Sequence, residues 1–127
     1  MQKQRNRGIL MEHKKTFING EWTDGTSGRI LQSVNPSTGE VIAEVRENSI
    51  SDVKAAVTAA KTAFYEERTW RDMDVQTRSD ILLRIASLVE ENLENIAETE
   101  AMDNGKPLRE AEADVDDAVH CFRYYAG

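Results

Sequence analysis

Short stretches in which apolar and polar residues alternate with a period of two occur in the first part of the chain, up to about residue 47. This period is typical of β-strands that bury one face. Near Phe17 the alternation is interrupted by Asn19–Gly20, which supplies the positive φ angles of a tight hairpin. A second turn is predicted at Asn35–Gly39, because Pro36 cannot donate a hydrogen bond to a strand ladder. Three apolar residues then share one strand face, namely Val41, Ala43 and Val45.

From Ser49 onward, apolar residues recur at the three- and four-residue spacing of an amphipathic helix. Ser49 and Asp52 fit a capping box, in which each side chain accepts a backbone hydrogen bond at the start of a helix. The apolar stripe of this first helix is predicted to consist of Val53, Ala56, Val57, Ala60 and Phe64.

Two further helices are predicted. Asp74 is expected to cap the second, which would span about 45 Å if it continued unbroken to Asp103. Gly105 provides a natural helix stop, and the fixed φ angle of Pro107 suits the start of the third helix. The second stripe runs through Ile81, Leu82, Ile85, Leu88, Val89 and Ile96, and the third through Ala111, Val115, Ala118, Val119 and Phe122.

These two periods predict an α+β fold with three parts. Residues 1–11 are a basic, polar leader that we expect to be flexible, unless Met11 is the true start of the protein. Residues 12–47 are predicted to form a small antiparallel β-unit. Residues 48–127 contain the three predicted helices.

The composition restricts the function classes. A net charge of −7 over 127 residues argues against a nucleic-acid-binding protein, because a phosphate backbone requires a clustered basic surface. No apolar run approaches the length of a membrane span, so no membrane partner is expected. The single cysteine excludes an internal disulfide and a thiolate metal cage, which makes a reducing cytoplasm the expected location.

Residues with catalytic potential are sparse. No glycine-rich dinucleotide loop follows a predicted strand, and no set of histidines and cysteines has metal-ligand spacing. His13 and His120 are isolated, and we interpret both as surface or structural residues. From pattern and composition alone, the chain is a soluble α+β domain without an assigned activity.

Several short motifs occur in an order that resembles the amino-terminal segment of the NAD(P)-dependent aldehyde dehydrogenase superfamily. The resemblance extends from about Lys15 to Gly127 and rests on FINGEW, VNPSTGEVIAEV, DVKAAVTAAKTAF, Trp70, DNGKP and RYYAG. It implies that the chain is the cofactor-side, amino-terminal part of a larger α/β fold. It also implies an enzyme that oxidises a small aldehyde with NAD or NADP and is a homo-oligomer at full length.

Members of this superfamily are several times longer, and their Rossmann portion and catalytic residues lie beyond the position that matches Gly127. In these enzymes a cysteine thiolate attacks the aldehyde, and a hydride passes to the nicotinamide. We therefore expect no catalytic and no cofactor-binding residue here, and an inactive chain when it is alone. Cys121 does not match the family's catalytic cysteine, and we predict a semi-buried, unreactive thiol beside the third apolar stripe.

Asp103 stands at the break between the second and third predicted helices. On a helical wheel it lies roughly 40° from Ile81, so it is predicted to point along the apolar stripe, and it is near the unfavourable C-terminal end of the helix dipole. Such a carboxylate requires a cation, which is Lys106, another basic side chain or a bound metal ion. The resemblance implies the third choice, a monovalent cation (K⁺ or Na⁺) held by Ser33, Val34 and Asp103. Oxygen ligands suit such a cation.

Asp114 and Asp117 are three residues apart, so their carboxylates share one helix face with Glu110. One interpretation is a solvated face. The chain resembles most the betaine-aldehyde and aminoaldehyde dehydrogenases, and in the plant-type enzymes the matching helix borders the substrate tunnel. The resemblance therefore implies a second interpretation, in which both aspartates attract an aldehyde that carries an ammonium group, either betaine aldehyde or an ω-aminoaldehyde.

The alternative function is a stand-alone, non-catalytic helical interaction module. This alternative predicts that the apolar stripes pack only on one another, whereas a segment of a larger enzyme would leave much apolar surface uncovered. Trp22, Trp70, Tyr124 and Tyr125 are interpreted as packing residues, the two tyrosines against an absent cofactor domain.

Overall fold

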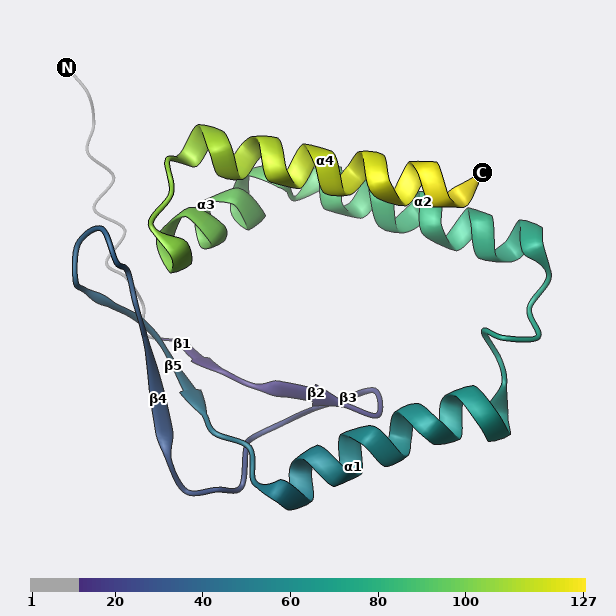
Figure 1. The fold of residues 1–127 in the computed structure, drawn as a ribbon, viewed down its shortest axis with the longest axis horizontal. Helices are drawn as coiled ribbons and strands as arrows, with labels where there is room; N and C mark the ends of the chain where they lie inside the picture. The colour runs from purple at the N-terminus through teal and green to yellow at the C-terminus, as the bar shows by residue number, and fades with distance from the viewer. Residues whose placement is uncertain (1–11) are drawn as a thin grey trace.

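The computed structural model describes residues 12–127, and the predicted leader at residues 1–11 lies outside this range. In Figure 1 the strands come first and the helices follow, which confirms the predicted order of a β-unit and then a helical part. The strands are β1 (Glu12–Lys14), β2 (Thr16–Ile18), β3 (Glu21–Thr23), β4 (Ile30–Val34) and β5 (Val41–Arg46). The helices are α1 (Ile50–Lys61), the π-helical turn η1 (Thr62–Glu67), α2 (Val75–Glu91), α3 (Leu93–Asn104) and α4 (Leu108–Ala126).

The strands form two small sheets. β2 and β3 make the predicted hairpin, in which Asn19 and Gly20 have φ angles of 52° and 81°. Phe17 lies opposite Trp22 in this hairpin, with ring centroids 5.0 Å apart. The other sheet has the order β1-β5-β4.

The antiparallel prediction holds for β2–β3 and β4–β5 but not for β1. β1 lies parallel to β5, with Glu12 opposite Ala43 in the register. Parallel strands require a long connection between them, and here β2, β3 and β4 provide it. The pairing of β1 with β5 is therefore non-local, and it cannot be predicted from the residues of a single turn.

Helix α1 starts as predicted but leaves its apolar stripe uncovered. Ser49 and Asp52 form the capping box, with the side chain of each accepting from the backbone of the other. No residue of α1 is fully buried. The stripe residues Val53 and Val57 are exposed, as is Phe64 of η1.

The second predicted helix is two helices. Asp74 caps α2 by accepting a hydrogen bond of 2.9 Å from the Thr77 backbone amide. The helix then ends at Asn92, which has φ and ψ angles of −110° and 13°. The Asn92 side-chain amide donates to the Leu88 carbonyl oxygen at 2.8 Å, so it competes for the backbone bonds that would continue the helix. α3 begins directly afterwards.

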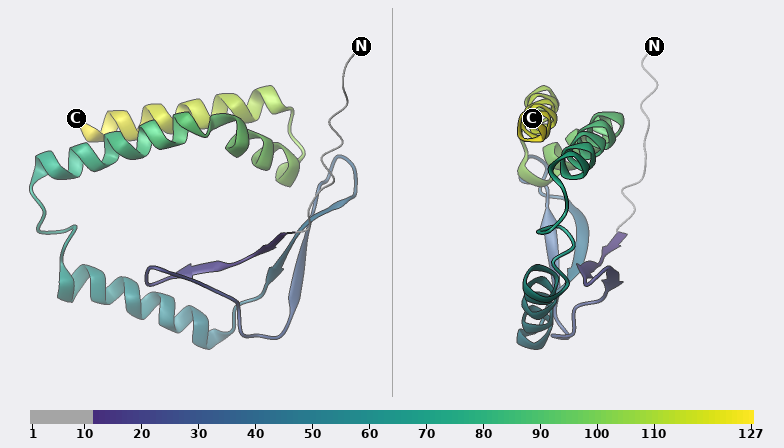
Figure 2. Two further views of the ribbon diagram at one scale, coloured as in Figure 1. Left: turned by 180° about the vertical axis from the view of Figure 1, so that it is seen from behind. Right: turned by 90° about the vertical axis from the view of Figure 1, so that its right-hand side faces the viewer.

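The core lies between α4 and the pair α2 and α3. In residues 12–127, the fully buried apolar residues are Ala86, Ala97, Ala111, Val115 and Val119. Three of these belong to the predicted core face of α4, which is confirmed. Small side chains allow close approach of the helix backbones, and α4 lies along α2 in the views of Figures 1 and 2.

Figure 1 shows α1 on the opposite side of the molecule from α2 and α4, with β4 and β5 at one end and the β2–β3 hairpin extending from that end along α1. Arg68, with a φ angle of 55°, ends the π-helical turn and begins the irregular segment that leads to α2. Within residues 12–127, no helix combines the length and the apolar character that a bilayer crossing requires.

Candidate functional site

The turn between β4 and β5 meets the junction between α3 and α4. Ser33, near the end of β4, donates a hydrogen bond of 2.6 Å from its hydroxyl to Asp103 Oδ1, in the last turn of α3. Val34 follows Ser33 directly, at a point where the register of β4 and β5 shifts. The structure therefore brings together the strand end and the carboxylate that the sequence analysis singled out.

A tight turn holds this strand end in place. Asn35 accepts hydrogen bonds from the Gly39 amide at its carbonyl oxygen and from the Ser37 amide at Oδ1, at 2.8 Å and 2.9 Å. The Ser37 hydroxyl donates to the Gly105 carbonyl oxygen at 2.9 Å. Gly105 has a φ angle of 77°, and a Cβ there would lie 2.7 Å from Pro36 Cγ. The turn and the helix junction thus fit together only because residue 105 has no side chain.

Asp103 itself is exposed, so the prediction that it points along the apolar stripe is wrong. The predicted direction of Asp103 relative to Ile81 holds only along one unbroken helix, but the chain breaks at Asn92 between α2 and α3. Lys106 is not its partner either, because the Lys106 ammonium group binds other carboxylates. The hydroxyl of Ser33 meets the carboxylate instead.

The donor atoms at this position fit a monovalent cation in their chemistry. The Asp103 carboxylate, the Ser33 hydroxyl and the backbone carbonyls of Ser33 and Val34 are all oxygen donors, which alkali cations prefer. Among residues 12–127, no group of three histidine, cysteine, aspartate or glutamate side chains is placed to hold a metal ion. A cation at Asp103 would therefore depend mainly on neutral oxygen atoms.

Lys106 links α3 to α4 through two carboxylates. Its Nζ lies 2.5 Å from Glu100 Oε1 and also pairs with Asp114 Oδ2. The hydrogen bonds to Asp114 and then to Glu100 raise the pKa of Lys106 above its ordinary value. The ammonium group consequently stays charged. It helps to hold α3 and α4 together across the turn that contains Gly105 and Pro107.

Asp114 and Asp117 differ in their surroundings, although both are exposed on α4. Asp114 is engaged by Lys106. Within residues 12–127, Asp117 has no ion-pair partner, while its neighbour Asp116 lies 3.5 Å from His120 Nδ1. Of the two predicted entrance residues, Asp117 therefore presents the less neutralised carboxylate.

Cys121 is exposed, which contradicts the predicted semi-buried thiol. The buried face of α4 runs through Val115 and Val119, and a residue two positions after Val119 is rotated about 200° around the helix. Cys121 therefore points away from the core rather than beside it.

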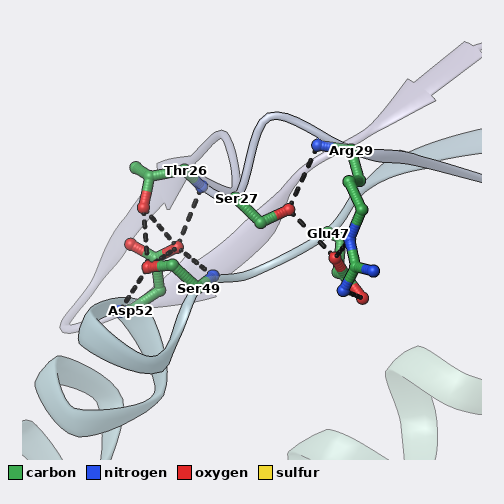
Figure 3. A network of polar contacts seen from close by, with 6 residues as sticks. All are labelled: Thr26, Ser27, Arg29, Glu47, Ser49 and Asp52. Carbon is green, nitrogen blue, oxygen red and sulfur yellow. Dashed lines mark hydrogen bonds and ion pairs between the residues drawn. The ribbon is translucent and has the colours of Figure 1, made fainter.

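A polar cluster that the sequence analysis only partly identified lies at the start of α1, as Figure 3 shows. Asp52 Oδ2 accepts hydrogen bonds from the backbone amides of Thr26 and Ser49 at 2.9 Å and 2.7 Å. The Thr26 hydroxyl adds a third bond, at 2.7 Å. These bonds, led by the one from the Thr26 amide, lower the pKa of Asp52 to about 2.

The same cluster continues to the loop before β4. Arg29 donates to both carboxylate oxygens of Glu47, with Nη2 2.7 Å from Oε1. The hydroxyl of Ser27 also donates to Glu47, at 3.0 Å. Arg29, as the main cause, lowers the pKa of Glu47 below its ordinary value. These residues tie a loop to a helix start, and the capping-box motif was their only signal in the sequence.

A match to a family model covers most of the chain. The model described as "Aldehyde dehydrogenase family" matches residues 22–127. The chain is 42% identical over 123 residues to aldehyde dehydrogenase family 2 member B4, mitochondrial, of Arabidopsis thaliana, which is 96% of this chain and 23% of that protein. It is 46% identical over 112 residues to the mitochondrial aldehyde dehydrogenase of Homo sapiens, which is 87% of this chain and 22% of that protein.

Solved structures agree with this match. An NAD-dependent aldehyde dehydrogenase from Sinorhizobium meliloti superposes with a TM-score of 0.89 at 28% identity, covering 99% of this chain and 25% of that one. An NAD⁺ complex of a Bacillus cereus aldehyde dehydrogenase has a TM-score of 0.85 at 38% identity, covering 100% and 26%. A betaine aldehyde dehydrogenase from Staphylococcus aureus, in complex with NAD⁺, has a TM-score of 0.85 at 35% identity, covering 90% and 23%. The chain thus spans about a quarter of the length of these proteins.

Proposed function

The chain belongs to the aldehyde dehydrogenase family, and we propose that it forms the amino-terminal segment of an NAD(P)-dependent enzyme that oxidises an aldehyde to a carboxylic acid. The observation that carries this proposal is the family match over residues 22–127, combined with a span of only 22–23% of the curated relatives. In this proposal residues 12–47 and 48–127 are the β-unit and the helical part of the cofactor-side region. The Rossmann and catalytic portions are supplied by further polypeptide.

The role of this segment is to support the fold, because the polar contacts described in residues 12–127 hold its elements together. NAD or NADP would accept the hydride when bound to the remaining portion. Asp52 and Glu47 anchor the start of α1, and Lys106 fixes α4 against α3. Cys121 is a free, exposed thiol on α4 and has no role in this proposal.

The uncovered apolar surface supports a segment over a stand-alone interaction module. The module predicts that the stripes pack on one another, but Val53 and Val57 of α1 are exposed, as are Tyr124 and Tyr125 of α4. Such large apolar surface is typical of a polypeptide that packs on another part of a protein. The exposed tyrosines also suit the predicted packing against a cofactor domain.

A chimera tests the proposed function. Residues 22–127 of this chain would replace the matching segment of the Bacillus cereus aldehyde dehydrogenase, and reduction of NAD⁺ by a simple aldehyde would be measured. We expect kcat/KM within about tenfold of the parent enzyme, and no turnover by the 127-residue chain alone. A folded but inactive chimera, or robust turnover by the chain alone, would contradict the proposal.

Within this proposal, the substrate is betaine aldehyde or an ω-aminoaldehyde. The exposed carboxylate of Asp117 supports this class, because fixed negative charge raises the local concentration of a cationic aldehyde, whereas Lys106 partly offsets the charge of Asp114. The likeness to the Staphylococcus aureus betaine aldehyde dehydrogenase is consistent with it. In the chimera, changing both aspartates to asparagine should lower kcat/KM for a cationic aldehyde relative to a neutral one. Asp116→Asn is the matched control, and an unchanged ratio in the double variant would exclude this substrate class.

The proposal also includes a K⁺ or Na⁺ ion held by Ser33, Val34 and Asp103. The oxygen donors near the Ser33–Asp103 hydrogen bond support it. The chimera should unfold at a higher temperature in KCl or NaCl than in choline chloride at equal ionic strength. Asp103→Ala should remove that difference, whereas a difference that persists in the variant would place the cation elsewhere.

Homo-oligomerisation of the full-length enzyme and a cytoplasmic location complete the proposal. The single cysteine supports a reducing compartment, because nothing in the sequence forms an internal disulfide. Fractionation of cells that produce the protein, with immunodetection of this chain, tests the location, and light scattering of the active chimera tests the assembly.

A further inference from the structure

Helix α1 presents three distinct faces. The half-buried face carries small residues, including Ala56 and Ala59, and α1 contacts β2. A polar face includes Lys54, Thr58 and Lys61, all of which are exposed. The third face, continued by η1, carries Ile50, Val53, Val57, Ala60 and Phe64 at helical spacing, and we refer to these five residues as the α1 stripe.

The α1 stripe has the apolar composition of a helix face that packs in a core, but its side chains are largely exposed. Val53, Val57 and Phe64 are 55%, 49% and 52% exposed. Fully burying a side chain of this size contributes about 1.5–3 kcal/mol, and about half of that remains available for each of these half-exposed residues. Isolated exposed apolar residues are ordinary, but a continuous helical row of them marks an interaction surface.

The position of α1 does not depend on its apolar face. Its start is anchored by the bonds of Asp52 to Thr26 and Ser49, seen in Figure 3, and its half-buried face meets β2. The stripe is therefore presented in a fixed orientation, and an apolar partner can dock without first ordering the helix. Such preorganisation lowers the entropic cost of binding.

The total exposed surface area of the chain indicates how much area a docking partner could cover. The chain exposes 10060 Å², whereas a folded monomer of 14.3 kDa exposes about 6,800 Å². Residues 1–11 account for at most about 2,000 Å² of that area as an extended chain. Subtracting both values leaves about 1,200 Å² of excess surface, which exceeds the roughly 800 Å² that each partner buries in a standard interface.

Resting on the proposed function, we propose that the α1 stripe is a docking surface for the remaining three quarters of an aldehyde dehydrogenase polypeptide, and that this portion can bind when it is a separate chain. The share of the relatives that this chain leaves unmatched, about three quarters of their length, supplies an occupant of the required size. α1 lies within the part that superposes on them. A second copy of this chain is a poorer occupant, because each copy brings a net charge of −7 and like charges oppose association.

Association in trans tests the docking surface. The affinity-tagged 127-residue chain would be co-expressed with the Bacillus cereus aldehyde dehydrogenase from which the matching segment has been deleted, and the pair would be isolated and their dissociation constant measured. We expect a one-to-one complex. The double variant Val53→Glu/Val57→Glu should weaken binding at least tenfold, and Thr58→Glu, on the polar face, should change it less than twofold.

Other results would overturn the proposal in identifiable ways. Equal binding by the Val53→Glu/Val57→Glu variant would show that the contact lies elsewhere, and a homodimer that this variant dissociates would make a second copy the occupant. Failure of the unaltered chain to bind, while the single-polypeptide chimera is active, would exclude docking in trans but leave the proposed function intact. Because the stripe is exposed, circular dichroism of the variant should match that of the unaltered chain and so exclude misfolding.

Discussion

The hydroxyl of Ser33 donates a hydrogen bond of 2.6 Å to Asp103 Oδ1, although the two residues are 70 positions apart in the sequence. Together with the bond from Ser37 to the Gly105 carbonyl oxygen, it joins the β4–β5 turn to the α3–α4 junction. This connection fixes the strands relative to the helices at one end of the molecule.

Replacing Ser33 with alanine should lower the free energy of unfolding by about 0.5–1 kcal/mol, because an exposed hydrogen bond to a carboxylate is lost. Urea denaturation of the 127-residue chain measures the effect. Thr58→Ala removes an exposed hydroxyl from α1 and is the control, for which we expect no loss. Equal effects of the two changes would mean that the Ser33 bond does not stabilise the fold.

Asp52 should make the stability of the chain depend on pH in the acid range. Its pKa is about 2 in the folded chain and 3.8 in the unfolded reference, so the folded state favours the ionised form. The stabilisation is present above the unfolded pKa and is lost as pH falls from about 4 to about 2. The melting temperatures of the unaltered chain and Asp52→Asn should therefore converge in that window, and a constant difference at all pH values would contradict this.

Gly105→Ala and Gly39→Ala separate backbone strain from steric contact. Both glycines have positive φ angles, 77° and 75°, but a Cβ at Gly105 would lie 2.7 Å from Pro36 Cγ, and one at Gly39 would meet nothing within 4 Å. We expect a loss of about 1 kcal/mol for Gly39→Ala from strain alone. Gly105→Ala should cost about 2–4 kcal/mol, because overpacking is added. Similar losses would show that the turn moves aside freely.

Val119→Ala should destabilise the chain by about 2 kcal/mol, because Val119 is completely buried between α4 and its neighbours. Val57→Ala removes the same atoms from the exposed α1 stripe and should change the free energy of unfolding by less than about 0.5 kcal/mol. Thermal denaturation of both variants measures the contrast. A large loss for Val57→Ala would mean that the stripe is already covered in the isolated chain.

Local signals in the sequence were sufficient for most elements. Asn19–Gly20, the Ser49–Asp52 capping box and the Gly105 helix stop each depend on backbone geometry within a few residues, and all three are found in the structure. The family resemblance is confirmed by the match over residues 22–127. The apolar spacing of α4 also placed Val115 and Val119 correctly in the core.

The remaining features depend on contacts that a local pattern does not encode. The break at Asn92 arises from a side-chain bond to Leu88 in a stretch without glycine or proline, so the wheel position of Asp103 was wrong. The parallel pairing of β1 with β5 and the bonds from Thr26 to Asp52 join distant residues. The spacing of the apolar residues in α1 predicts a buried face. It does not show that residues 12–127 leave this face uncovered.

The wide sequence separation of Ser33 and Asp103 has a consequence for the order of folding. Closing a loop of that length costs more chain entropy than forming the turn between α3 and α4, which spans only Gly105, Lys106 and Pro107. The helical hairpin should therefore appear early, and the attachment of the strands to it should come late. Weakening that attachment should then accelerate unfolding while leaving the refolding rate almost unchanged.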